Sequence, residues 1–133
     1  MTPEEARLLN PLQLAYMGDT VWELLIRARA MERRLTVRHM HMAAVAGVNA
    51  KAQAEALARI TDSLTDPEAD MVRRGRNAHP HHVGPRHQDP ADYKAATGLE
   101  ALVGYLYISG QEERLMTLFQ LARQEDDLCP AQR

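Results

Sequence analysis

The sequence predicts an all-α protein built as a single helical domain. Capping side chains recur along the chain, and four of them (Thr2, Asn10, Thr65 and Asp89) are followed by a proline or by a glutamate or glutamine three residues later. Apolar residues recur at spacings of three and four, and no segment alternates as a half-buried strand does. A chain of 133 residues suffices for one core. We therefore expect one domain over residues 1–133, with its core at about 10–125 and a polar C-terminal tail.

Two start signals lie close together near the N-terminus. Thr2, followed by proline and glutamate, predicts a short helix that ends near Leu9. Asn10, followed by proline, predicts a long second helix that continues to about Arg33. The three-and-four spacing predicts that its buried stripe consists of Leu14, Met17, Val21, Leu24, Leu25 and Ala28.

The middle of the chain predicts three further helices. Thr36 is suited to cap the first of them, which we expect Gly47 to interrupt. Asn49 precedes an alanine-rich helix over 50–60. Thr65 and the sequence DPE then start a helix that extends into RRGRNA, where Gly75 marks a bend or an end.

A long loop separates these helices from the last two. Residues 79–90, HPHHVGPRHQDP, contain enough proline and glycine to break regular structure. Asp89 and its following proline start a helix that continues through Ile108. Gly110 ends it, and a final helix is expected from Gln111 to about Glu125.

Composition favours a soluble cytoplasmic protein. The chain is 45% hydrophobic, and no window approaches the 18 or so apolar residues of a membrane helix. Its first residues, MTPEEARLL, are acidic and lack the features of a secretion signal. Cys129 is the only cysteine, so no intrachain disulfide can form, which suits a reducing compartment.

The charge is unevenly distributed although the net value is only −2. Residues 71–88 hold four arginines and no acidic residue, and they also contain four of the six histidines. The rest of the chain has 12 basic and 18 acidic residues. A basic segment of this kind is suited to bind phosphates.

Two helices carry a carboxylate beside small residues. Gly18 and Asp19 lie in the middle of the long helix, where glycine costs about 0.5–1 kcal/mol relative to alanine. Glu100 lies in TGLEALVGYLY, on a face with Gly104. Close packing at Gly18 and Gly104 would bring Asp19 and Glu100 together, where a hard cation such as Mg²⁺ or Mn²⁺ relieves their repulsion. The alternative is a solvated aspartate on an amphipathic helix.

Several motifs resemble the ribonuclease III family. LAYMGDTVWELL resembles its signature helix, and TGLEALVGYLYISGQEERL resembles its second acidic helix. NPLQLAYMGD, VNAKAQA and VRRGRNA resemble the compact bacterial Mini-ribonuclease III branch, for which we expect no appended double-stranded-RNA-binding domain. The resemblance covers about residues 10–120, which is nearly the whole chain.

The resemblance implies an all-α homodimer that cuts double-stranded RNA with Mg²⁺, in maturation of the 23S ribosomal RNA precursor. It implies that Asp19 and Glu100 are catalytic and bind the metal, for which Mn²⁺ is a substitute. Larger family members carry further acids where this chain has Leu12, Ala15 and Thr97, so those roles do not transfer. The resemblance leaves open the number of metal ions and whether a ribosomal protein takes part.

The basic segment is the expected RNA-binding surface. Guanidinium groups bind phosphate bidentately, and the shallow groove of A-form RNA is accessible to side chains. On this basis we assign RNA contacts to Arg73, Arg74, Arg76 and Asn77, and weaker ones to Lys51 and Gln53. The alternative for RRGR is a solvated helix end, since cations favour helix C-termini. We interpret the remaining arginine cluster, Arg27, Arg29, Arg33, Arg34 and Arg38, as ordinary surface.

Two other functions remain open. The first is a noncatalytic RNA-binding dimer, since three acids of the family site are absent. The second is a metal-storage or metal-sensing module built on His79, His81, His82 and His87, although their spacing matches no familiar zinc pattern. Trp22 and Tyr16 are expected in the core or a dimer interface, because duplex RNA hides its base faces.

Overall fold

A computed structural model describes residues 1–78 and 89–123, in which every regular element is helical and no strand occurs. This confirms the predicted all-α class. The elements in chain order are α1 (Pro3–Arg7), α2 (Pro11–Glu32), α3 (Val37–Val48), α4 (Ala50–Ile60), the 3₁₀ turn η1 (Thr61–Ser63), α5 (Asp66–Asn77), α6 (Pro90–Ile108) and α7 (Glu112–Ala122). Within these two ranges no helix combines the length and the apolar character needed to cross a bilayer.

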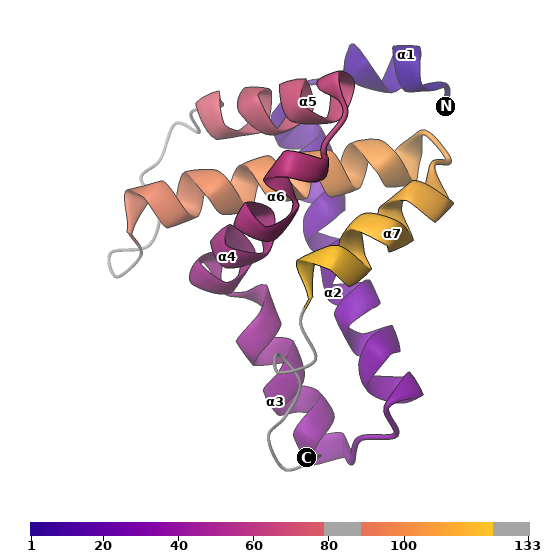
Figure 1. Ribbon diagram of the computed structural model, residues 1–133, viewed down its shortest axis with the longest axis vertical. Coiled ribbons are helices and arrows are strands. Elements are labelled where there is room, and N and C mark those ends of the chain that lie inside the picture. Colours follow the sequence, from indigo (N-terminus) through magenta and orange to yellow (C-terminus); the bar gives the residue numbers. More distant parts are fainter. Residues whose placement is uncertain (79–88, 124–133) are drawn as a thin grey trace.

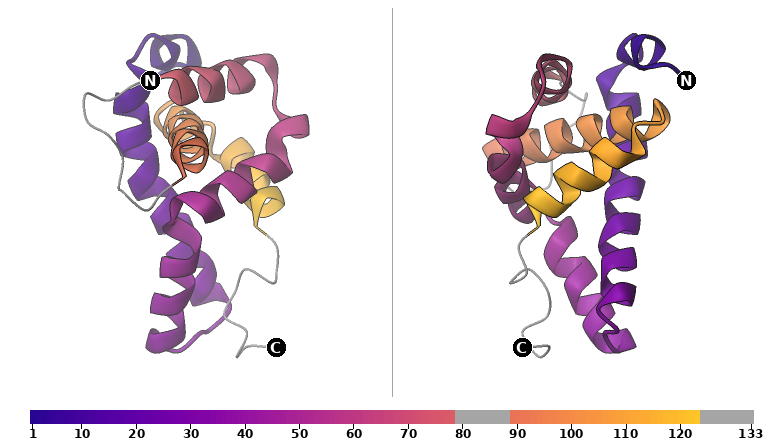
Figure 2. Two further views of the ribbon diagram at one scale, coloured as in Figure 1. Left: turned by 90° about the vertical axis from the view of Figure 1, so that its left-hand side faces the viewer. Right: turned by 45° about the vertical axis from the view of Figure 1, so that its right-hand side comes forward.

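Helix α6 runs through the middle of the molecule, and the other long helices are arranged around it (Figure 1). Helix α2 crosses α6, α5 lies alongside it, and α4 and α7 pack on its remaining side. The lower half of α2 and the whole of α3 form a hairpin that extends away from the other helices, as both views of Figure 2 show. The crossing of α2 and α6 therefore lies between this hairpin and the α5 end of the molecule.

The predicted helix starts are all found, because each depends on local hydrogen bonds. Thr2 and Thr65 form complete capping boxes with the glutamates three residues later. Asn10, Thr36, Asn49 and Asp89 each accept a hydrogen bond from a backbone N–H in the first turn of the helix that follows. These side chains satisfy donors that have no partner within the helix itself.

Two predicted helix interruptions are wrong. Helix α3 continues through Gly47 to Val48, and α5 continues through Gly75 to Asn77. Both glycines lie at close contacts: a Cβ on Gly75 would be 2.8 Å from the Cβ of Ala101 in α6. Glycine is therefore needed at both positions because neighbouring elements approach closely, and the helix continues through each of them. The final helix also ends earlier than expected, at Ala122.

Helices α2 and α6 touch backbone to backbone at Gly18 and Gly104. A Cβ built on Gly18 would be 1.7 Å from the carbonyl oxygen of Glu100, and one on Gly104 would be 1.9 Å from the carbonyl oxygen of Leu14. Real Cβ atoms do not approach other atoms so closely, so no larger residue fits at either position in this arrangement. The expected close packing at these two glycines is present.

The predicted buried stripe of α2 is partly wrong. Leu24 is 57% exposed and Ala28 is also exposed, whereas Trp22 and Ile26 are buried. Because Gly18 contacts α6, the face of α2 that carries Gly18 is the buried one. Trp22 and Ile26 continue this face and are buried in place of Leu24 and Ala28. Trp22 packs edge-on against Phe119 of α7 at 5.3 Å and donates its indole N–H to the carbonyl of Gly47. Trp22 is thus a core residue, which is one of the two places expected for it.

Replacing Gly18 with alanine tests this crossing. We expect Gly18→Ala to lower the free energy of unfolding by about 3 kcal/mol or more, because the new methyl forces two helix backbones apart. Thr20→Ala is the matched control: Thr20 is exposed on the same helix, and we expect a change within about 0.5 kcal/mol. Urea unfolding of both variants measures the difference, and equal stabilities would contradict the close crossing.

Candidate active site

The crossing of α2 and α6 brings two carboxylates from distant parts of the sequence together. Asp19 follows Gly18 in α2 and is exposed, while Glu100 of α6 is partly buried. The side chain of Asp19 is close enough to hydrogen bond with the Glu100 carboxyl and to act on it through its charge. The juxtaposition expected from the sequence is therefore present, and the roles of the two residues stay predictions.

The environment of Glu100 favours its protonated form. Burial is the largest cause, and the hydrogen bond to Asp19 and the negative charge of Asp19 add to it, so that its pKa rises to about 9. The side chain of Gln53 acts in the opposite direction and lowers this pKa. Near neutral pH Glu100 therefore keeps its proton. A divalent cation that takes the place of this proton relieves the repulsion between the two carboxylates.

Gln53 is the third polar side chain at this place, and its position corrects the sequence-based expectation. Gln53 is only 3% exposed, so its side chain offers no surface to RNA. Its amide points toward Glu100 from the first turn of α4, and within the described ranges its Nε2 makes no hydrogen bond of good geometry. Nothing in the alanine-rich sequence of α4 distinguishes a buried glutamine from an exposed one, which is why the sequence alone missed this contact.

Within residues 1–78 and 89–123, no third carboxylate joins the acidic pair as a candidate metal ligand. Among the residues that the structure describes, no group of three or more His, Cys, Asp or Glu side chains could hold a metal ion. Ala15 and Thr97, two positions at which the resemblance implies acids in larger proteins, are 8% and 9% exposed, and the Thr97 hydroxyl donates to the carbonyl of Tyr93. Two carboxylate ligands still fit Mg²⁺, because this ion keeps several of its waters and is often bound by one or two carboxylates together with substrate phosphate.

The predicted RNA-contacting arginines of α5 differ in how they are held. Arg74 donates to the carbonyls of Arg7 and Leu9, at 2.7 and 3.0 Å, and so ties the end of α1 to α5. Arg73 is exposed and pairs with Asp70 one turn earlier. Arg76 is exposed, and no ion pair or hydrogen bond of its guanidinium is found within residues 1–78 and 89–123. Arg76 is therefore the arginine of this group with the most freedom to bind an external anion.

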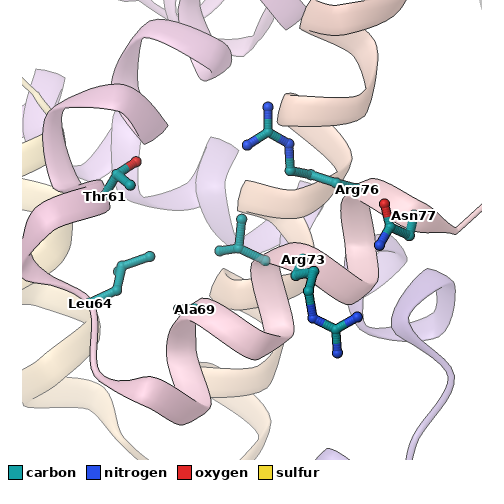
Figure 3. A pocket seen from close by; sticks show the side chains of 7 residues that line it. Thr61, Leu64, Ala69, Arg73, Arg76 and Asn77 are labelled. Atoms are coloured by element: carbon teal, nitrogen blue, oxygen red, sulfur yellow. The ribbon is translucent and has the colours of Figure 1, made fainter.

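A shallow pocket lies beside these arginines, between η1 and α5. It is lined by Thr61, Leu64, Ala69, Val72, Arg73, Arg76 and Asn77. Figure 3 shows that the guanidinium groups of Arg73 and Arg76 extend away from each other, one on each side of the α5 ribbon. The two charges are thus spread along a surface, an arrangement suited to successive phosphates rather than to one small anion.

The basic end of α5 and the acidic pair lie on different faces of α6. Helix α5 packs on Gly98 and Ala101, since a Cβ on Gly98 would be 2.8 Å from the Cγ of Arg76. Glu100 and Gly104 belong to the face that meets α2, because each residue turns the helix by about 100°. Lys51 is exposed in the first turn of α4, two residues before Gln53.

Other predicted features lie elsewhere. The four histidines of the loop, His79, His81, His82 and His87, and also Cys129, fall outside the described residues. Tyr16 is 84% exposed in this chain, so it does not belong to the core. The interface expected for it stays a prediction.

Comparison with known proteins gives a consistent family assignment. The family model described as "Ribonuclease III domain" matches residues 12–111. A protein of Symbiobacterium thermophilum named Mini-ribonuclease 3 is 50% identical over 115 residues, which are 86% of this chain and 88% of the relative. A protein of the same name from a Thermoanaerobacter species is 42% identical over 93% of this chain and 87% of its own length.

A solved structure agrees with this assignment. A crystal structure of a Fusobacterium nucleatum protein superimposes with a TM-score of 0.77 at 30% sequence identity. The match covers 86% of this chain and 92% of that one.

The raised pKa of Glu100 predicts how the stability of the metal-free protein depends on pH. The pKa of Glu100 is higher in the folded state than in the unfolded chain, so the folded state binds more protons between about pH 4.5 and 9. Stability from this group is therefore complete below that window and falls as the pH rises through it, by up to about 1.4 kcal/mol per pH unit.

Glu100→Gln removes this titration while preserving the shape of the side chain. In EDTA we expect the variant to be more stable than the wild type at pH 8, by at least about 1 kcal/mol, with the difference vanishing near pH 4.5. Urea unfolding across this range measures it. A difference that does not change with pH would show that Glu100 is not held in its protonated form.

Proposed function

The chain belongs to the ribonuclease III family, and on that premise we propose that Asp19 and Glu100 form its Mg²⁺-dependent catalytic site. Family membership makes the protein an endoribonuclease, a hydrolase that acts on phosphodiester bonds of double-stranded RNA. The observation that supports the site is the convergence of two carboxylates at the Gly18–Gly104 crossing. Both are oxygen ligands of the kind that Mg²⁺ prefers, with Mn²⁺ as a substitute.

The two carboxylates have distinct tasks in this proposal. When bound, Mg²⁺ lowers the pKa of the attacking water and stabilises charge on the phosphate and the leaving oxygen. Asp19 is exposed and therefore accessible to both an ion and the RNA backbone. Glu100, partly buried, would lose its proton on binding the ion and would hold it together with Asp19. No side chain has to act as a nucleophile.

We also propose that the exposed cations of α5 and α4 bind the RNA backbone. Arg73, Arg76 and Asn77 line one surface, and Lys51 is exposed in the first turn of α4. Arg74 contributes by holding α1 in place, since its guanidinium already bonds two carbonyls. Phosphate contacts of this kind supply affinity and register without reading the base sequence.

The proposed biological role is maturation of the 23S ribosomal RNA precursor in the cytoplasm. One chain offers one acidic pair, whereas a duplex has two strands, so we propose a homodimer that places one pair at each strand. Cleavage of a precursor duplex with and without large-subunit ribosomal proteins tests for an assisting protein, and sedimentation equilibrium tests the dimer.

A noncatalytic RNA-binding protein is the second candidate. It is favoured by one observation: the described residues provide two carboxylates at the crossing and no third one. A wild-type protein that binds duplex RNA tightly but leaves it intact in Mg²⁺ would support this candidate against the enzyme.

Cleavage of duplex RNA separates the two candidates. We expect the wild type to cut a duplex of about 30 base pairs in Mg²⁺ but not in EDTA. Asp19→Asn and Glu100→Gln are each expected to reduce the rate at least 100-fold while duplex binding stays as tight or becomes tighter, because a negative charge is lost near phosphate. Glu55→Gln, an exposed change on α4, is the control and should keep the wild-type rate. Full activity of either pair variant would refute the assignment.

The salt dependence of binding tests the RNA surface. In the double variant Arg73→Gln, Arg76→Gln, we expect the slope of log K against log salt to become shallower by about 1 to 2, because fewer counterions are released. Arg27→Gln is the control, since Arg27 pairs with Glu23 on the distant α2–α3 hairpin and should leave the slope unchanged. Fluorescence anisotropy in EDTA measures both, and an unchanged slope in the double variant would remove α5 from the RNA surface.

A further inference from the structure

The buried amide of Gln53 is a polar group that the proposed mechanism does not use. Its side chain is 3% exposed, and its Nε2 has no hydrogen-bond acceptor of good geometry within the described ranges. Buried donors without an acceptor are uncommon in folded proteins, because each loses its hydrogen bonds to water without replacement. The Nε2–H of Gln53 can therefore gain a hydrogen bond when a neighbouring acceptor turns toward it.

The carboxyl of Glu100 is the acceptor on which the Gln53 side chain acts. Gln53 lies in the first turn of α4, whose backbone is fixed by the hydrogen bond from its own N–H to the carbonyl of Asn49 at 3.0 Å. Helix α4 packs against α6, and the Gln53 side chain acts on Glu100 from this side while Asp19 acts on it from α2. Three helices thus contribute one polar side chain each to a single carboxyl.

We propose that Gln53 is a positioning residue, which donates its Nε2–H to one oxygen of Glu100 and so directs the other oxygen toward Asp19 and the cation. This inference rests on the proposed function of the Asp19–Glu100 pair. Gln53 touches neither the cation nor the RNA in this scheme. It acts only through the orientation of Glu100.

A neutral amide is the side chain that such a position requires. Lysine or arginine would also donate a hydrogen bond, but its charge would compete with the cation for Glu100. A carboxylate would repel Glu100 and leave it without a donor. Hydrogen bonds to metal-binding carboxylates from residues behind them are generally worth 10- to 100-fold in metal affinity or activity.

The competing explanation is that Gln53 only helps to hold the fold. The two explanations differ in what an apolar side chain of similar shape would do. If Gln53 is structural, Gln53→Met lowers the stability of the metal-free protein. If Gln53 instead orients Glu100 for the cation, the metal-free protein keeps or gains stability, because a buried amide whose Nε2 has no acceptor of good geometry within the described ranges has been replaced by an apolar group.

The experiment compares wild type, Gln53→Met and Gln120→Met, the last an exposed glutamine on α7 that serves as the matched control. Thermal unfolding in EDTA, Mn²⁺ binding by titration calorimetry, and single-turnover cleavage of a duplex are measured for each. For Gln53→Met we expect an unchanged or higher Tm, Mn²⁺ binding weakened 10- to 100-fold, a cleavage rate reduced by a similar factor at subsaturating metal, and wild-type duplex affinity in EDTA. Gln120→Met should match the wild type in all measurements.

Two results would overturn this inference alone: wild-type Mn²⁺ affinity in Gln53→Met, or a Tm in EDTA lowered by more than about 5 °C, a loss typical of a structural side chain. A wild-type protein that neither binds Mn²⁺ nor cleaves duplex RNA would overturn the proposed function itself, and the inference with it. The two failures are distinguishable because the first is seen in the variant and the second in the wild type.

Discussion

The contact between α2 and α6 at Gly18 and Gly104 is the constraint on which the rest of the molecule depends. Two helix backbones meet there without side chains between them, and the carbonyl of Glu100 occupies the space that a Cβ of residue 18 would need. This contact sets which face of α2 is buried and brings Trp22 into the core against α7. It also brings the side chains of Asp19 and Glu100, 81 positions apart in sequence, next to each other.

The same contact places Glu100 where its ionised form is unfavourable. Burial and the neighbouring Asp19 raise the pKa of Glu100 to about 9, so Glu100 retains a proton where an isolated carboxyl is ionised. Such a pair is suited to exchange its proton for a divalent cation, which couples metal loading to proton release. The Gln53 side chain opposes the rise in this pKa, and within the described ranges its Nε2 makes no hydrogen bond of good geometry, which is consistent with an arrangement prepared for a bound cation.

The sequence predicted the features that depend on local chemistry or on a distinctive motif. The helix starts at Thr2, Asn49 and Thr65 depend on hydrogen bonds within one turn, and glycine beside a carboxylate in α2 pointed to a close contact. It failed where tertiary packing decides. The exposure of Leu24 follows from how α2 is rotated against α6, and the burial of Gln53 follows from how α4 packs. Gly75 resembled a helix end because the sequence does not reveal that Ala101 packs against it.

The central claim is that the two carboxylates at this crossing hold one hard cation. Anomalous scattering from crystals grown with Mn²⁺ measures this most directly. The account predicts a peak at about 2 Å from carboxylate oxygens of both Asp19 and Glu100. Ordered crystals at saturating Mn²⁺ with no peak between these side chains, or with a peak only at other residues, would contradict it.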